Sequence, residues 1–413
     1  MKKFKLQKIW KQLGPGLITG SSDDDPSGIT TYSQAGAKFG LDTLWTALFT
    51  WPLMTAIQHM CAKIGLVTKQ GLAGTVKKEF PSWVIWFVLI ISIPAILLNI
   101  GANISAMSGV ICLLVPGIHP MVWGLCISGF IYWFMIQFSY RKFSGMLKYI
   151  CLILLVYAII PFLIRVDLTK VMFATFVPKI TFNSEYAGML IAIFGTTLSP
   201  YLFFWQSNMD AEETSSLKNV KKGMRTLFIN EKTDIIIGMG FSNLIMFFII
   251  LTTGTVLHAS GKMEINTLED AALALKPLAG KNAFVLFSSG ILGTGLLSIP
   301  VLSGTIAYMV CETMGWKMGM NHTYHEAKTF YNLIGLSLAI GILFQILKIN
   351  PIKSLAYSAF GYGLVAPVII VIILMITNNK RIMGNQTNNL ITNILGWISV
   401  VLMASSVLFY FYR

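Results

Sequence analysis

The stretch Gly20-Ser21-Ser22-Asp23-Asp24-Asp25-Pro26-Ser27-Gly28 lies in the middle of the first long apolar run of the chain, residues 12–36. An ionised carboxylate in the hydrocarbon core of a bilayer costs several kcal/mol unless a partner compensates its charge. Three carboxylates beside a proline and a glycine therefore predict a helix that breaks in mid-membrane and turns its acidic side chains toward a cation.

The composition places this stretch in a polytopic membrane protein. Of the 413 residues, 55% are hydrophobic and 12% are charged, and no polar stretch is long enough to fold as a separate soluble domain. We therefore expect one transmembrane domain over residues 1–413. The net charge of +14 fits short basic loops at anionic lipid headgroups better than nucleic acid. The cysteines and histidines lack metal-type spacing, so no resident cofactor, zinc site or disulfide framework is expected.

About eleven apolar runs are long enough to span a membrane. They cover residues 12–36, 43–67, 83–113, 120–139, 145–164, 185–209, 234–257, 283–313, 329–348, 355–376 and 390–411. The N-terminal tail and the loops after the second, fourth and sixth runs are rich in lysine and arginine. The positive-inside rule then predicts a multi-pass cell-membrane protein with a cytoplasmic N-terminus and an extracytoplasmic C-terminus.

The sixth run shares the oddity of the first, because Gly195-Thr196-Thr197-Leu198-Ser199-Pro200-Tyr201 also puts a cap-type residue before a proline. Asp25-Pro26 and Ser199-Pro200 are both signals for a helix start. We expect both spans to break and restart, and their offset of five spans predicts two inverted five-helix repeats. The predicted all-α fold comprises repeats at about 12–164 and 185–376 and an extra helix at about 390–411.

The chemistry predicted at the first break is that of a hard cation site. Unwound backbone exposes carbonyl oxygens, which together with a carboxylate suit Mg²⁺, Ca²⁺ or Mn²⁺. We expect Asp25 to contact the metal, Asp24 to lie beside or behind it, and Asp23 to face the cytoplasmic vestibule; alternatively, some of them only cap half-helices or pair with a buried lysine. Gln206 could reach a hydrated ion through water, or bind a neighbouring helix.

Two groups of motifs resemble the natural-resistance-associated macrophage protein (Nramp) family of divalent-metal transporters. Gly14-Pro15-Gly16, Asp25-Pro26 and the stretch 34–40, Gln-Ala-Gly-Ala-Lys-Phe-Gly, resemble its first helix. The stretches 62–68, Ala-Lys-Ile-Gly-Leu-Val-Thr, and 71–73, Gly-Leu-Ala, resemble the end of its second. The match runs through about the first seven spans. The resemblance implies the leucine-transporter fold, with alternating access around spans one and six and a divalent metal ion as substrate.

The chain departs from the family at its metal ligands. The family's first-helix motif is Asp-Pro-Gly-Asn, and Gly28 stands where its Asn would be. Its sixth-helix motif is Met-Pro-His, which here reads Ser199-Pro200-Tyr201, while the carbonyl of Thr196 takes the position of its backbone ligand. The soft thioether is absent, and Gly28 leaves space where the family has an asparagine. Both departures favour Mg²⁺, which tends to keep several of its water molecules. This pattern is similar to the Nramp-related magnesium transporters.

The chain also lacks the residues that form the proton route of the family. Asn103 and Ala106 stand where the third helix of the family carries an Asp and a Glu, and Tyr201 replaces its histidine. A phenol with an ordinary pKa of ~10 is a poor relay at neutral pH. We therefore expect transport without obligatory proton coupling, since a divalent ion crossing ~100 mV gains roughly 4.6 kcal/mol.

Several functional hypotheses remain open. The first is Mg²⁺ uptake, with Mn²⁺ as a further substrate, and the second is an ordinary proton-coupled Mn²⁺ or Fe²⁺ importer. A Mg²⁺-dependent intramembrane prenyltransferase is a remote third, because it needs a second acidic cluster and none is visible within a span; a metal sensor is a fourth. The expected partners are the divalent ion and the bilayer, with no obligate protein partner. Asp210, Glu212 and Glu213 are expected to be solvated, or to form a cation funnel.

Overall fold

A computed structural model describes residues 15–138, 158–159, 163, 166–215, 220–346 and 350–412, and every regular element within these ranges is helical. Most of the fifth predicted span, 145–164, lies outside the described residues. The other predicted spans all correspond to helices, and eight helical segments of the described part are long and apolar enough to cross a membrane. The prediction of an all-α polytopic membrane protein is confirmed.

The long helices follow the predicted runs. They are α2 (Pro15–Asp23), α3 (Pro26–Phe39), α4 (Trp45–Thr68), α6 (Ser82–Leu114), α7 (Pro120–Gln137), α11 (Ser184–Thr197), α12 (Pro200–Ser215), α13 (Val220–Val256), α16 (Ala283–Met314), α17 (Lys328–Ile346), α18 (Pro351–Asn378) and α20 (Leu390–Tyr412). Short helices lie between them: α5 (Leu72–Glu79), α10 (Leu168–Phe176), α14 (Leu268–Ala272), α15 (Lys276–Ala279) and α19 (Lys380–Met383). The first and sixth spans are each split in two, as α2–α3 and α11–α12.

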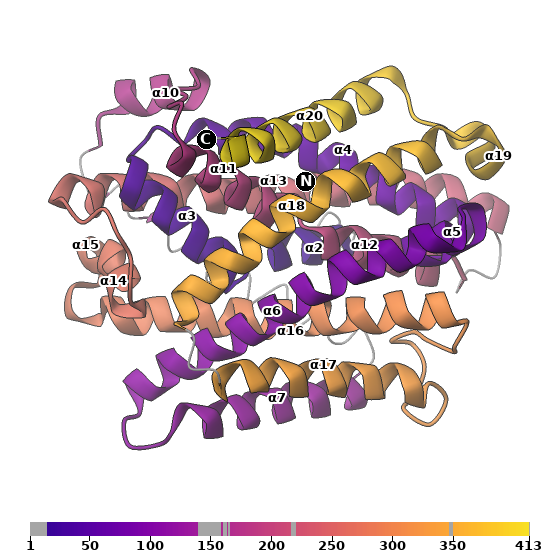
Figure 1. The fold of residues 1–413 in the computed structure, drawn as a ribbon, viewed down its shortest axis with the longest axis horizontal. Helices are drawn as coiled ribbons and strands as arrows, with labels where there is room; N and C mark the ends of the chain where they lie inside the picture. The colour runs from indigo at the N-terminus through magenta and orange to yellow at the C-terminus, as the bar shows by residue number, and fades with distance from the viewer. Residues whose placement is uncertain are drawn as a thin grey trace, which may run out of the picture.

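The long helices lie side by side and define two ends of the molecule (Figure 1). The short helices α10, α14 and α15 gather at one end, and α5 and α19 lie at the other. Because spanning helices run between the two faces of a bilayer, these ends correspond to its two sides. Below, they are called the α10 end and the α5 end.

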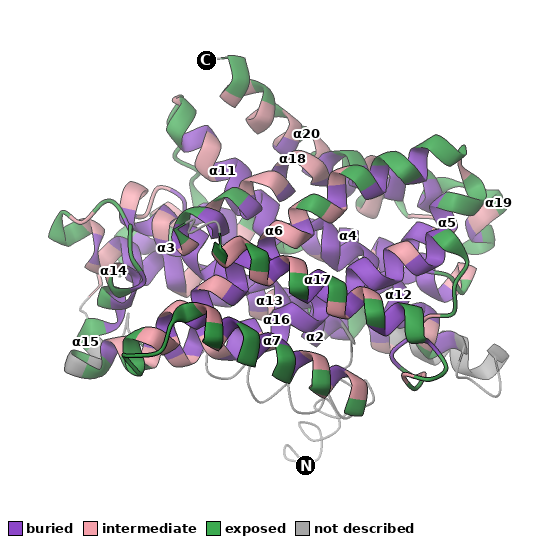
Figure 2. Ribbon diagram, turned by 60° about the horizontal axis from the view of Figure 1, so that its bottom comes forward, coloured by how far each residue is buried: buried purple, intermediate pink, exposed green. Residues whose placement is uncertain are grey.

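Close packing of small residues holds α2 and α12 in the centre of the bundle. A β-carbon at Gly20 of α2 would lie 2.3 Å from the carbonyl oxygen of Gly238 on α13. A β-carbon at Gly65 of α4 would lie 2.1 Å from the carbonyl oxygen of Ser207 on α12. Small residues permit such backbone contact between membrane helices. Both broken spans are therefore buried in the middle of the protein (Figure 2).

One boundary differs clearly from the sequence prediction. The predicted sixth and seventh runs leave residues 210–233 as a loop, whereas α12 continues to Ser215 and α13 already begins at Val220. Lysine and glutamate are good helix formers, so a helix can continue beyond its apolar part. A hydropathy window detects only that apolar part, which explains the error.

Candidate metal site

The first break follows directly from the acidic stretch. Helix α2 ends at Asp23, and α3 begins at Pro26 with Asp25 as its N-cap. The Asp25 Oδ1 atom accepts a hydrogen bond from the Gly28 backbone N–H at 2.8 Å. Proline fits the first helical position because that position needs no N–H donor. The predicted break, cap and restart are therefore confirmed in this span.

Asp25 binds α6 through its second carboxylate oxygen. Asp25 Oδ2 accepts hydrogen bonds from the side-chain amides of Asn99 at 2.8 Å and Asn103 at 3.1 Å. The Asn99 Oδ1 atom in turn accepts from the Ser358 hydroxyl of α18 at 3.2 Å. Asp25 is only 1% exposed, and three N–H donors offset part of the cost of burying its charge. The two asparagines hold this carboxylate.

Asp23 and Asp24 have far fewer donors. Both are fully buried, and the Ser242 hydroxyl of α13 lies 3.0 Å from Asp23 Oδ2 and 3.4 Å from Asp24 Oδ1. Asp23 Oδ1 and Asp24 Oδ2 are buried with no hydrogen-bond partner. The prediction that Asp23 faces a vestibule is wrong in this conformation, because its side chain packs against α13. A bound cation would supply the partner that these buried carboxylate oxygens lack.

The second break is closed by Ser199. Its hydroxyl donates to the carbonyl oxygens of Gly195 at 3.0 Å and Thr196 at 2.5 Å. Ser199 therefore supplies a hydrogen-bond donor to carbonyl groups in the last turn of α11, which have no partner within the helix. The sequence had instead predicted that Ser199 caps the start of α12. The Thr196 carbonyl, the predicted backbone ligand, already accepts this hydrogen bond. A metal ion at that carbonyl would share it with the hydroxyl or displace it.

Gly28 does not open the extra space that the sequence suggested. A β-carbon at Gly28 would lie 2.9 Å from the Asp23 carbonyl oxygen and 3.5 Å from Thr196 Oγ1. The two broken spans have closed against each other at this point, so a larger side chain has no room. The absence of a side chain at Gly28 thus brings α3 close to both α2 and α11.

Gln206 joins helices across the same region. Its Oε1 atom accepts from the Thr19 hydroxyl of α2 at 2.7 Å, and its Nε2 atom donates to Asp210 Oδ2 at 2.7 Å. The Tyr201 hydroxyl similarly donates to the Ser22 carbonyl at 2.8 Å. Both contacts attach α12 to α2. A ligand role for Gln206 through water stays a prediction.

The predicted site residues come from both broken spans, and all are buried. They are Asp24, Asp25, Gly28, Thr196, Ser199 and Gln206. Among the described residues, no group of three His, Cys, Asp or Glu side chains is arranged to hold a metal ion directly. An ion at the break would therefore need carbonyl, hydroxyl or water oxygens besides the carboxylates. Such an all-oxygen set suits hard cations such as Mg²⁺ and Mn²⁺.

Two features of the region were not predicted from the sequence. Ser242, whose hydroxyl contacts Asp23 and Asp24, belongs to a span that carried no motif. The burial of Asp210 is the second feature: this residue was expected to be solvated or to form part of a cation funnel, but it is only 2% exposed on α12. A sequence signal did exist in α13, because Ser242, Asp234 and Glu231 recur at helical spacing along one face.

Comparison with known proteins gives matches over nearly the whole chain. Residues 16–412 match the family described as "Natural resistance-associated macrophage protein-like". A "Divalent metal cation transporter MntH" of Caldanaerobacter subterraneus subsp. tengcongensis is 26% identical over 414 residues, covering 98% of this chain and 92% of the relative. A protein of the same name from Deinococcus radiodurans is 25% identical over 404 residues, covering 96% and 88%.

Solved structures agree on the fold. The manganese transporter of Eremococcus coleocola, in complex with an aromatic bis-isothiourea substituted compound, has a TM-score of 0.81 at 15% identity, covering 97% of this chain and 86% of that one. Mhp1, a nucleobase-cation-symport-1 family transporter in a closed conformation, has a TM-score of 0.53 at 13% identity, covering 97% and 92%. The predicted leucine-transporter fold, with its first and sixth helices broken, is confirmed.

Proposed function

The chain belongs to the natural resistance-associated macrophage protein-like family, and we propose that it carries divalent metal cations across a membrane by alternating access around its two helix breaks. The observation that carries the proposal is the pair of buried carboxylate oxygens, Asp23 Oδ1 and Asp24 Oδ2, that lack any donor beside the break. Family membership makes the protein a multi-pass membrane transporter rather than an enzyme, which removes the prenyltransferase hypothesis.

The contacts of α2 suggest how the α5 end would open. Asp234 Oδ2 of α13 accepts from the Gly16 backbone N–H at 2.7 Å. Thr19 binds Gln206, and Tyr201 binds the Ser22 carbonyl. These hydrogen bonds and the Gly20 contact on α13 attach α2 to its neighbours. A movement of α2 away from α12 and α13 breaks them all and gives the acidic stretch access to the α5 end.

We propose that the α5 end is cytoplasmic. The described loops and short helices at this end contain Lys69, Lys77, Lys78, Lys380 and Arg381. The positive-inside rule counts the basic residues near helix ends and favours the α5 end as the cytoplasmic one.

Two candidate substrates follow from different observations. The relatives are divalent metal cation transporters and one structural neighbour is a manganese transporter, which favours Mn²⁺, with the proton coupling that the resemblance to the family implies. The side chains at the break favour Mg²⁺, since Ser199 offers oxygen where the family has a thioether. Asn103 and Ala106 also leave no titrating group on that face of α6, and the Asn103 amide is bound to Asp25. The second candidate is therefore uncoupled Mg²⁺ transport driven by the membrane potential.

Flux in proteoliposomes separates these candidates. Purified protein would be given millimolar Mg²⁺ or micromolar Mn²⁺, with a metal dye or a pH dye inside the vesicles. Mg²⁺ entry without acidification supports the second candidate, and Mn²⁺ entry with acidification supports the first. Asp25→Ala should abolish both fluxes, while Glu264→Gln, an exposed carboxylate, should leave them unchanged. Unchanged flux in Asp25→Ala refutes the site, and no divalent flux in the unmodified protein refutes the function.

A further inference from the structure

A second group of buried acids lies between the break and the α5 end. Asp210 of α12 is 2% exposed, and Glu231 and Asp234 of α13 are 8% and 4% exposed. These three residues are called the second acidic cluster below. No second acidic cluster was predicted within a span, and that prediction is wrong. The cluster exists because α13 begins well before its apolar part, so that Glu231 and Asp234 lie on this helix inside the bundle.

The second acidic cluster lines up with the first along one seam. On α13, Ser242, Gly238, Asp234 and Glu231 follow each other at helical spacing. At 1.5 Å per residue, Asp234 lies about 12 Å from Ser242 along the helix axis. Ser242 contacts the acidic triplet, Gly238 contacts Gly20, and Asp234 binds the Gly16 N–H. The seam between α2 and α13 therefore leads from the triplet to the cluster.

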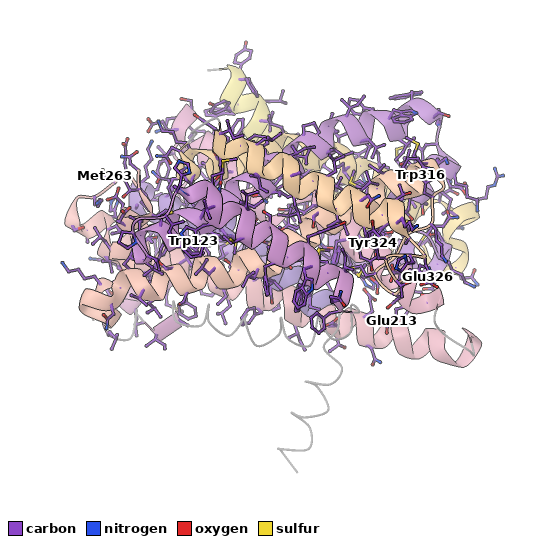
Figure 3. The ribbon with its side chains drawn as sticks, turned by 90° about the horizontal axis from the view of Figure 1, so that it is seen from below. Trp123, Glu213, Met263, Trp316, Tyr324 and Glu326 are labelled. Carbon is purple, nitrogen blue, oxygen red and sulfur yellow. The ribbon has the colours of Figure 1, made fainter. Side chains whose placement is uncertain are left out.

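The residues near Glu231 and the position of Glu213 show which end of the molecule this seam reaches. His59 and Lys63 of α4 lie near Glu231, and the Lys63 ammonium reaches the Gln386 carbonyl, next to α19, at 3.1 Å. Glu213, one helical turn after Asp210, lies at the same end as Trp316 and Glu326 (Figure 3). The cluster thus stands between the triplet and the α5 end.

The negative charge of Glu231 in this cluster is only partly compensated. When ionised, Asp210 and Glu231 would repel each other, as would Glu231 and Asp234. His59 Nδ1 lies 3.2 Å from Glu231 Oε1, but Glu231 Oε2 is buried without a hydrogen-bond partner. Lys63 attracts Glu231 from a distance and donates its hydrogen bonds to the Gln386 carbonyl and Asn388 Oδ1, both at 3.1 Å. A cation would relieve both the repulsion and the unpartnered oxygen.

We propose that Asp210, Glu231 and Asp234 form a second cation site, which holds a hydrated divalent ion on its way between the break and the α5 end. The inference rests on the proposed transport function. No three acidic side chains in the described part converge for direct ligation. Water molecules of the ion therefore bridge to the carboxylates. Such binding suits Mg²⁺ above all, since this ion gives up its water reluctantly.

The test counts ions on the purified full-length protein. Equilibrium dialysis against Mg²⁺ or Mn²⁺, read by atomic absorption, is applied to the unmodified chain, to Asp25→Ala and to the double variant Asp210→Asn/Glu231→Gln. We expect two ions on the unmodified chain, and one on each variant. Glu79→Gln, an exposed carboxylate of α5, is the matched control and should keep both ions.

The single variant Glu231→Gln keeps the experiment decisive if the double variant fails to fold. It retains Asp210 and Asp234, so we expect it to bind the second ion about tenfold more weakly. A second ion that remains at unchanged affinity in both variants overturns the inference. If one ion binds throughout while flux acquires a new pH dependence in the variants, a proton occupies the cluster and the inference is also wrong. Failure of the transport function itself is seen separately, as absent flux in the unmodified protein.

Discussion

Replacing Asp24 by asparagine should stabilise the ion-free protein and weaken its response to metal. In the ion-free state, Asp24 Oδ2 is buried without a donor beside two further carboxylates. An unsatisfied buried polar group costs about 1–3 kcal/mol, and more when it is charged. The amide removes the charge and keeps the shape of the side chain. Asp24→Asn should therefore unfold with a free energy about 1–3 kcal/mol higher than the unmodified chain.

The metal response should change in the opposite direction. A ligand at 100 times its Kd stabilises the state that binds it by about 2.7 kcal/mol. The unmodified protein should show this gain as a Tm rise on the order of a few °C with saturating Mg²⁺ or Mn²⁺. Asp24→Asn leaves one charge fewer at the break, so its Tm should start higher and rise less.

Thermal unfolding can be followed as the rise in signal of a thiol-reactive fluorogenic dye above the baseline set by the exposed Cys126, because Cys61 and Cys311 are fully buried and become reactive only on unfolding. Glu264→Gln removes an exposed carboxylate and should change neither the starting Tm nor the response. An Asp24→Asn protein that melts earlier than the unmodified chain and keeps the full metal response would refute the reasoning. Asp24 would then be stabilised by groups other than a cation.

Three further variants address the other contacts of the break. Ser199→Met restores a soft thioether and should shift the preference from Mg²⁺ toward Mn²⁺ by on the order of tenfold, measured by competitive uptake. Gly20→Ala puts a methyl group 2.3 Å from the Gly238 carbonyl, so α2 should detach and exchange its amide hydrogens faster, as mass spectrometry would show. Asn99→Ala removes a donor to Asp25 and should lower the unfolding free energy of the ion-free protein by about 1.5–3 kcal/mol, read from the same melts; an unchanged stability would mean that water replaces the amide.

The two breaks were predictable because their signals are local. A cap-type side chain followed by proline restricts the backbone of its own two residues, whatever packs around them. The same local reasoning failed at Ser199, whose hydroxyl turns back to Gly195 and Thr196 rather than forward to α12. A serine at a break can satisfy carbonyls before it or N–H groups after it, and the sequence does not distinguish the two.

The partners of the carboxylates were harder to predict, because they come from distant helices. Asn99 and Asn103 lie 74 and 78 residues from Asp25, and Ser242 lies 219 residues from Asp23. A single sequence carries no record of such pairings. The space expected beside Gly28 was misjudged for the same reason, since the groups that fill it belong to α2 and α11 as well as α3.

The distribution of donors around the triplet suggests which seam the ion follows. On the α6 side, Asp25 receives neutral amide donors, and the titrating acids that the family carries there are replaced by Asn103 and Ala106. On the α13 side, Asp23 and Asp24 share one hydroxyl, and the next acids along that helix are again buried. Negative charge is thus satisfied toward α6 and left unsatisfied toward α13. A cation released from Asp25 is attracted along the α2–α13 seam, so the acids of α13 should govern release at the α5 end more than any residue of α6.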